Sequence, residues 1–267
     1  MKLSIITVNL NNLHGLRKTM NSILSQTCKD FEWIVIDGGS TDGSKELIEQ
    51  SANHITYWVS EPDNGIFDAM NKGINVAHGD YLLFLNSGDY LYGKTVIEIF
   101  INHKSRNDVI YGNTIVVNST GEVNHKWITP KNLRFSSFFK GGISHQSAFI
   151  SKNCFDQIHY ENHIGADTEL FIRLLARDYS FEKYEEFVSC YDNSGVSSTI
   201  NYKEYCHIVM KSLPLGAQED YVNIIQFLDV DLAKMIIEII KAPRLLRNIT
   251  RFFVLPLSFV AKLLPKE

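Results

Sequence analysis

Short apolar runs alternate with amphipathic stretches along the first 112 residues of the chain. Five runs are too apolar to leave a solvated face, and we interpret them as buried β-strands at residues 3–10, 31–37, 55–60, 81–85 and 109–112. Between them, apolar residues recur every three or four positions, as on one face of a helix. The two clearest sets are Leu16, Met20, Ile23 and Leu24, and Ile66, Ala69, Met70, Gly73, Ile74 and Ala77. Asn11 or Asn12 can cap the first of these helices. The pattern predicts an α/β fold: an open, mostly parallel, twisted sheet flanked by helices.

The strand and helix alternation stops near residue 113. We expect a hairpin around residues 118–121, a strand near residues 144–150 and a helix from about residue 167 to 177. We interpret residues 1–112 as the first half of one domain and residues 113–200 as its second half, a mixed extension of the sheet that completes the same site. Residues 201–267 are expected to form a helical C-terminal extension.

Composition narrows the class of protein. The chain has 267 residues, of which 45% are apolar and 21% charged, so a buried core is expected and disorder is not. The net charge of −4 argues against a general nucleic-acid binder. The four cysteines contain no CxxC pair, which favours reduced thiols over a zinc site. Without a signal peptide or about 18 consecutive apolar residues, we expect a cytoplasmic protein.

The charge is unevenly distributed along the chain. Residues 1–231 carry 19 basic and 28 acidic residues, whereas residues 232–267 carry seven basic and two acidic residues. Lys241, Arg244, Arg247 and Arg251 recur at helical spacing among apolar residues. Such a segment is typical of peripheral attachment to an anionic membrane, here the inner face of the cytoplasmic membrane. Alternatively, it packs on its own domain or on a partner protomer. The oligomeric state is not indicated.

Polar clusters follow the strands of the first half. Asp37, Asp63 and Asp89 each belong to one of these clusters, and the ends of parallel strands meet at one edge of a sheet. Gathered carboxylates repel each other unless a cation or hydrogen-bond donors offset their charge, and oxygen ligands favour Mg²⁺ or Mn²⁺. The alternative is that these residues only form turns. Neither a GxGxxG motif nor a P-loop is present, which excludes the usual nicotinamide and P-loop sites.

Four segments together carry a resemblance to a known family: residues 4–9 (SIITVN), 34–44 (IVIDGGSTDGS), 61–73 (EPDNGIFDAMNKG) and 83–89 (LFLNSGD). In order and spacing they resemble the family-2 glycosyltransferases, inverting enzymes with a GT-A type nucleotide-sugar-binding fold. A weaker likeness continues through residues 143–146, 165–169 and 195–198. The resemblance implies a hexosyltransferase that moves a sugar from a nucleotide sugar, expected to be a UDP-sugar, to a saccharide or lipid-linked saccharide. The implied pathway is bacterial surface-polysaccharide biosynthesis. The alternative is a non-catalytic nucleotide-sugar- or carbohydrate-binding scaffold.

The resemblance also implies a set of residues that bind the donor. Thr7 and Asn9 would line the nucleobase and ribose pocket, and Asp37 would accept a hydrogen bond from the base. Asp63 and Gly65 would border the nucleotide. The remaining donor contacts would come from Asn86 and from Lys72, although Lys72 could equally form a surface pair with Asp68 one helical turn away.

The metal motif differs from the family pattern. The family has Asp-x-Asp or Asp-x-Asp-Asp after the fourth strand, whereas this chain has Asn86-Ser87-Gly88-Asp89. Asp89 would then be the single charged ligand to Mg²⁺ or Mn²⁺, with the donor diphosphate completing the site. We therefore expect weak metal binding in the absence of donor.

Inverting transfer also needs a base on the acceptor side. Asp167, at the start of a predicted amphipathic helix, is the candidate; it could instead be only the helix N-cap, and Glu169 is the alternative base. His145 and Gln146, with Glu169, are candidates for contacts to the acceptor or the sugar, and a purely structural histidine is the alternative reading of His145.

Overall fold

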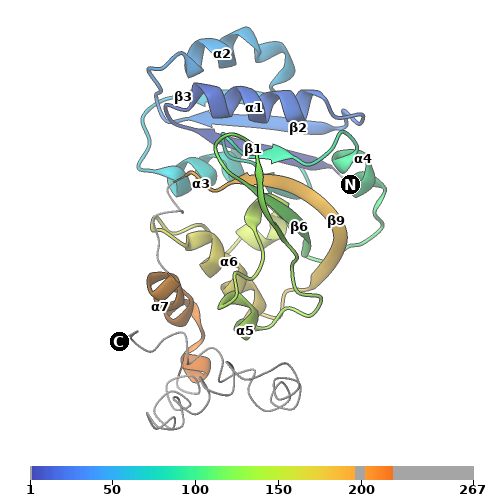
Figure 1. Ribbon diagram of the computed structural model, residues 1–267, viewed down its shortest axis with the longest axis vertical. Helices are drawn as coiled ribbons and strands as arrows, with labels where there is room; N and C mark the ends of the chain where they lie inside the picture. Colours follow the sequence, from blue (N-terminus) through green and yellow to red (C-terminus); the bar gives the residue numbers. More distant parts are fainter. Residues whose placement is uncertain (1, 196–201, 219–267) are drawn as a thin grey trace. The chain divides into compact units, whose positions relative to one another are not determined.

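The computed structural model describes residues 2–195 and 202–218, with strand β1 (Leu3–Asn9) at the centre of the N-terminal half of the sheet. β1 pairs in parallel with β2 (Phe31–Asp37) on one side and with β4 (Tyr81–Phe84) on the other, and β3 (Tyr57–Ser60) extends the sheet beyond β2. Every residue of β1 is buried, as expected for a strand covered on both faces. The strand order reverses between β1 and β4, which is where open α/β sheets bind ligands (Figure 1).

Helices cover both faces of this parallel half. α1 (Leu13–Leu24) and α2 (Ser44–Gln50) share a core with one face, together with α4 (Val96–Asn102), and α3 (Ile66–Val76) lies on the other (Figure 1). Glycine is required where α3 meets β1, because a Cβ at Gly73 would lie 2.5 Å from Cγ2 of Ile6. The predicted apolar faces were wrong at two positions: Leu24, in the last turn of α1, and Ile66, in the first turn of α3, are 36% and 47% exposed.

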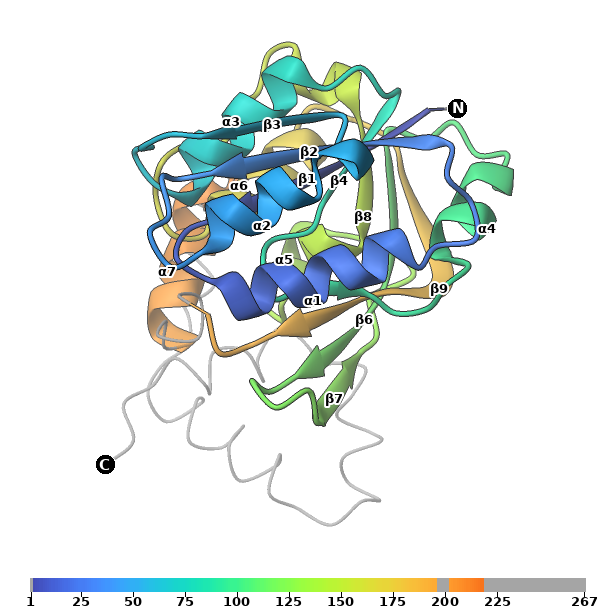
Figure 2. The same cartoon turned by 90° about the horizontal axis from the view of Figure 1, so that it is seen from above.

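The second half extends the sheet in mixed orientation, as expected. The strands of this extension are β5 (Tyr90–Leu91), β6 (Val109–Val117), β7 (Val123–Trp127), β8 (Ala148–Ser151) and β9 (Phe181–Asp192), of which β5 and the start of β6 precede residue 113. The order along the described sheet is β3-β2-β1-β4-β8-β6-β9-β5, with β7 paired to β6. β8 is antiparallel to both β4 and β6, whereas β9 runs parallel to β6 and antiparallel to β5. The expected hairpin is confirmed between β6 and β7, which project from the sheet (Figure 2).

Shorter elements complete the described chain. They are the 3₁₀ turns η1 (Ala52–His54), η2 (His145–Ser147) and η3 (Lys152–Phe155), and the helices α5 (Phe135–Phe138), α6 (Ala166–Leu175) and α7 (Tyr202–Ser212). The predicted strand at 144–150 therefore begins later, because His145 and Gln146 form a turn before β8. The predicted strand at 109–112 continues to Val117, since the hairpin partner β7 extends its pairing.

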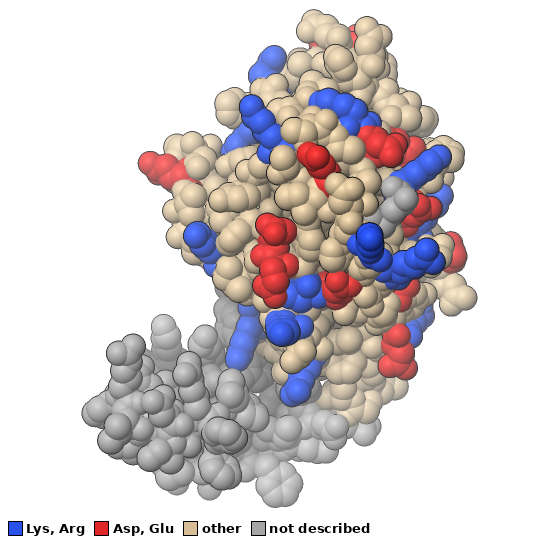
Figure 3. Space-filling view, turned by 90° about the vertical axis from the view of Figure 1, so that its right-hand side faces the viewer, with Lys and Arg blue, Asp and Glu red and all other residues tan. Residues whose placement is uncertain are grey.

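The chain divides into two compact units, residues 1–200 and 201–267, and α7 belongs to the second. The basic segment expected at residues 232–267 and most of the segment 195–198 lie outside the described residues. Within residues 2–195 and 202–218, no helix is long and apolar enough to cross a membrane. Acidic and basic side chains are interspersed on the face of the molecule drawn in Figure 3.

Candidate active site

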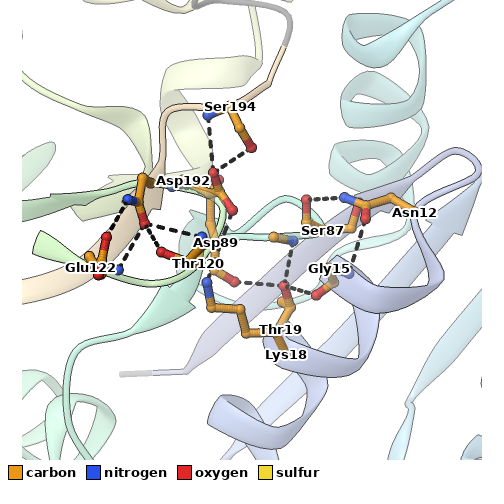
Figure 4. Close-up of polar contacts among 12 residues, drawn as sticks. Asn12, Gly15, Lys18, Thr19, Ser87, Asp89, Thr120, Glu122, Asp192 and Ser194 are labelled. Atoms are coloured by element: carbon orange, nitrogen blue, oxygen red, sulfur yellow. Dashed lines mark hydrogen bonds and ion pairs between the residues drawn. The ribbon is translucent and has the colours of Figure 1, made fainter. Parts of the chain in front are cut away.

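The turn after β4, residues 86–89, is hydrogen-bonded to side chains of helix α1 and its N-cap. The hydroxyl of Thr19 donates to the carbonyl of Asp89 at 2.6 Å and accepts from the amide of Gly88 at 3.0 Å. Asn12, confirmed as the N-cap of α1, accepts from the amide of Gly15 and donates from its Nδ2 to the carbonyl of Ser87 at 3.0 Å (Figure 4). The helix and the turn therefore form one hydrogen-bonded unit at the carboxyl end of β4.

Asp89 is enclosed at the end of this turn, with 4% of its surface exposed. Its Oδ1 accepts from the amide of Asp192 at 2.9 Å, and its Oδ2 accepts from Nε2 of Gln146 at 3.1 Å (Figure 4 shows the first of these). Burial raises the pKa of the Asp89 carboxyl to about 6, although both hydrogen bonds favour the ionised form. The turn is thereby joined to the end of β9 and to the turn before β8.

His145 lies between the same turn and helix α6. Its Nδ1 is 3.1 Å from Oδ2 of Asp167, and its Nε2 is 3.4 Å from Nδ2 of Asn86. His145 is 7% exposed, whereas the Asp167 side chain keeps 32% of its surface open. Three residues that are far apart in the sequence, Asn86, His145 and Asp167, therefore form a continuous polar row that reaches solvent at the carboxylate.

Asp167 sits in the first turn of α6 and is not its N-cap. The cap is Gly165, whose φ of 89° is in the left-handed region that favours glycine. Burial opposes ionisation of Asp167, but the hydrogen bond and charge of His145, with amides of the first helical turn, lower its pKa below the ordinary value. The carboxylate is therefore ionised at neutral pH and partly open to solvent.

Asp37 is the centre of a second polar group, at the end of β2. It is fully buried and accepts from Nδ2 of Asn9 at 2.7 Å, from the hydroxyls of Ser40 and Ser60, both at 2.6 Å, and from the amide of Ser40 at 2.9 Å. Burial alone would raise the pKa of Asp37, but these hydrogen bonds outweigh it, so the pKa lies below its ordinary value. A nucleobase could reach this carboxylate only by displacing one of those donors.

Other predicted donor residues have different surroundings. Thr7 is buried, and its hydroxyl accepts from Nε1 of Trp33 at 3.1 Å, so in this structure it meets a core side chain. Asp63 accepts from the amide of Gly65 at 2.8 Å and lies against Gly38, where a Cβ would be 2.7 Å from its Oδ2. Asp63 thus lies beside the end of β2 and binds Gly65, and the expectation that both border the nucleotide stays a prediction.

Lys72 and Glu169 are engaged elsewhere. Nζ of Lys72 lies 2.9 Å from Glu61 and 3.9 Å from Asp68, so the surface pair considered from the sequence is formed. Glu169 pairs with His163 at 2.7 Å and with Arg173 at 3.6 Å. Neither side chain is hydrogen-bonded to the row of Asn86, His145 and Asp167, and Glu169 is accordingly less open than Asp167 to an acceptor.

A divalent cation would have few protein ligands at this site. In the described part of the chain, no group of three or more His, Cys, Asp or Glu side chains is arranged to hold a metal ion. Asp89 alone carries the charge of its motif, and both of its oxygens already accept hydrogen bonds. The protein residues described do not build a metal site by themselves, so a cation here would depend on phosphate oxygens and water.

Three contributors to the site were missed from the sequence. Thr19 is a buried polar residue inside the apolar stripe of α1, an anomaly that could have been noticed. Ser40 belongs to the segment 34–44 but had no role of its own assigned from the sequence. The hydrogen bond from the amide of Asp192 to Asp89 could not be predicted from a sequence pattern, because the two residues are 103 positions apart.

Comparison with known proteins gives consistent results. The family model described as Glycosyl transferase family 2 matches residues 4–169. A PGL/p-HBAD biosynthesis glycosyltransferase of Mycobacterium bovis is 32% identical over 226 residues, covering 80% of this chain and 85% of the relative. An uncharacterized glycosyltransferase of Mycobacterium tuberculosis is 44% identical over 95 residues, covering 35% of this chain and 36% of the relative.

Solved structures support the fold. TarS 1–349 of S. aureus in complex with UDP-GlcNAc matches with a TM-score of 0.63 and 16% identity, covering 79% of this chain and 66% of that one. A mannosyltransferase of Pyrobaculum calidifontis in complex with GDP-Man and Mn²⁺ matches with a TM-score of 0.56 and 13% identity, covering 97% of this chain and 86% of that one. The predicted GT-A type α/β fold is confirmed.

Proposed function

Because the chain belongs to glycosyltransferase family 2 and is a glycosyltransferase, we propose that it transfers a sugar, with inversion, from a nucleotide sugar to an acceptor. The proposed acceptor is a saccharide or lipid-linked saccharide, and the proposed general base is Asp167. The observation that carries the proposal is the 3.1 Å hydrogen bond between His145 and a carboxylate that remains partly open. The non-catalytic scaffold considered from the sequence is not favoured, because the matched relatives are glycosyltransferases.

The proposed step is a displacement at the anomeric carbon. The acceptor oxygen forms a bond to that carbon while the bond to the donor diphosphate breaks, and the acceptor proton passes to the Asp167 carboxylate. The proton moves as the new bond forms, when the acceptor oxygen becomes strongly acidic, so an ionised carboxylate suffices as base. His145 would fix the direction of that carboxylate, and alignment of the reacting groups would supply much of the rate enhancement.

The donor would lie at the carboxyl ends of β1, β2 and β4, where the strand order reverses. Asn9, Asp37, Asp63 and Gly65 border this edge, and Asn86 connects it to His145. A UDP-sugar is the proposed donor, in keeping with the UDP-GlcNAc complex of the TarS structure. Mg²⁺ or Mn²⁺ would bind only together with the donor, with Asp89 as the single carboxylate of its motif, and no step above depends on the metal.

The proposed acceptor class follows from the basic segment of the sequence. Residues 232–267 carry seven basic and two acidic residues, which suits attachment to an anionic membrane surface and access to a lipid-linked acceptor. Replacing Lys241, Arg244, Arg247 and Arg251 by Gln in the full chain should abolish sedimentation with anionic liposomes. Unchanged sedimentation would contradict the membrane assignment.

The catalytic proposal is tested by Asp167→Asn. We expect the transfer rate to fall by roughly 100-fold to 10,000-fold, the usual contribution of a general base, while stabilisation of the protein by the nucleotide sugar in a thermal-shift screen is unchanged. The matched control is Asp156→Asn, which changes an exposed carboxylate in the segment before α6. Full activity of Asp167→Asn would reject the base, and no stabilisation by any nucleotide sugar would reject the donor class.

A further inference from the structure

The segment between η3 and α6 leads directly to Asp167, and one side chain of α3 holds its backbone. Asn71 donates from Nδ2 to the carbonyl of Tyr160 at 2.8 Å and accepts at Oδ1 from the amide of the same residue at 3.1 Å. The two residues are 89 positions apart. A single side chain therefore binds both polar groups of one residue in a segment that has no regular secondary structure.

Only a primary amide can form this pair. A carboxamide presents a donor and an acceptor side by side, whereas a carboxylate has only acceptors and a hydroxyl has one oxygen. Aspartate at position 71 could still accept from the amide of Tyr160, but its second oxygen would face the Tyr160 carbonyl oxygen. The isosteric substitution thus converts one of the two hydrogen bonds into a repulsive contact.

The same segment is fixed to α3 by packing as well. The Tyr160 ring is 96% buried, with its centroid 5.6 Å from that of Phe67 on α3 and 5.3 Å from that of Phe84 on β4. Nδ2 of Asn162 donates to the carbonyl of Asn64, immediately before the start of α3. Burial, and with it the negative charge of Asp167, raises the pKa of Tyr160 well above its ordinary value.

Helix α3 also begins at the donor side of the proposed site. Its N-cap is Gly65, and Asp63 accepts from the Gly65 amide. A single helix thus starts at the loop proposed to border the donor and carries, less than two turns later, the asparagine that holds the segment before the base. We propose that Asn71 is a positioning residue, which sets Asp167 in register with the donor by binding the backbone of Tyr160. This inference rests on the proposed role of Asp167.

The test compares Asn71→Asp with Asn75→Asp, the same substitution at an exposed position of the same helix. We expect Asn71→Asp to lower kcat by about 10-fold to 100-fold, as for a misplacement of about 1 Å, with the donor KM unchanged within about twofold. Hydrogen exchange of the peptide containing Tyr160 should become faster in Asn71→Asp only. Asn75→Asp should retain the wild-type kcat and exchange.

A double-mutant cycle separates positioning from general stability. If Asn71 acts through the base, Asn71→Asp should lower the residual rate of Asp167→Asn by less than twofold. An equal loss in both backgrounds, or an unchanged kcat with wild-type Asp167, would overturn the inference. Full activity of Asp167→Asn alone would instead overturn the proposed function. If Asn71→Asp does not fold, Asn71→Ala, which removes both hydrogen bonds without adding a charge, serves in the same cycle.

Discussion

Nδ1 of His145 lies 3.1 Å from Oδ2 of Asp167, and this contact connects the turn before β8 to the first turn of α6. The imidazole is almost fully buried, whereas the carboxylate is one third exposed. The buried partner therefore fixes the direction of the exposed one. It also determines at which pH the carboxylate becomes ionised, since burial alone would raise the pKa of Asp167.

His145→Gln should move the acidic limb of the kcat–pH profile to higher pH. A base works only when it is ionised, that is above its pKa, and the charge of His145 helps to lower that pKa. Without the imidazole, the effect of burial on the Asp167 carboxyl is opposed by fewer interactions, so the limb should move to higher pH. The profile is measured from pH 3 to pH 8 at saturating donor, because the wild-type limb lies at acidic pH. An unchanged limb would show that His145 does not act on the base.

Thr19→Val should loosen the turn after β4. The valine keeps the shape of threonine but leaves the amide of Gly88 and the carbonyl of Asp89 without their shared partner. We expect a loss of about 1–3 kcal/mol in the free energy of unfolding and a higher donor KM. Urea denaturation measures the first and initial rates the second. Thr27→Val, at an exposed position, is the control and should change the KM little.

Gly38→Ala should weaken donor binding. The new Cβ would lie 2.7 Å from Oδ2 of Asp63, which must move away from the end of β2. We expect the donor Kd to rise about tenfold, equivalent to about 1.4 kcal/mol, as measured by titration calorimetry. The matched control is Gly93→Ala, because a Cβ at Gly93 has no atom within 4 Å. Equal affinities for both variants would exclude Asp63 from the donor site.

Glu32→Gln should lower stability at neutral pH and much less in acid. The Glu32 carboxylate accepts from the hydroxyl of Ser4 and the amides of His78 and Gly79, and these bonds outweigh burial and lower its pKa. A lowered pKa contributes stability above the unfolded-state value of 4.5, and that contribution is lost as the pH falls through the folded-state value.

For this variant we expect a cost of about 1.5–3 kcal/mol at pH 7, the range for hydrogen bonds to a charged group, and a smaller cost at pH 4. Guanidinium denaturation at the two pH values measures the difference. Glu49→Gln, which changes an exposed carboxylate of α2, is the control. A cost for Glu32→Gln that does not depend on pH would contradict the assignment.

The elements that the sequence predicted well are those defined by neighbouring residues. The strand at 31–37 matches β2 at both ends, and Asn12 caps α1 as its position before an apolar stripe suggested. The errors at Leu24 and Ile66 occur in terminal turns, where a residue keeps its helical spacing but no longer faces the sheet. Local periodicity cannot detect where the partner surface ends.

The site was predictable where a strand ends and unpredictable where segments meet. Asp37 and Asp89 follow strands, so their grouping at one edge of the sheet could be expected. The pairing of His145 with Asp167, and of Asn71 with Tyr160, depends on how loops of the second half pack, and no short-range pattern records it. The roles proposed for Asp167, Asn86 and the donor residues therefore remain predictions.

The hydrogen bond from the amide of Asp192 to Asp89 also bears on the synthesis of the protein. When a growing chain has emerged as far as Asp89, the motif is present, but the backbone amide that binds this carboxylate has not yet been translated, because it lies 103 residues later. The hydrogen bonds of the buried Asp89 carboxylate cannot all form before β9 joins the sheet. The nascent N-terminal half should consequently be unable to capture nucleotide, and donor binding should begin only after most of the first compact unit has left the ribosome.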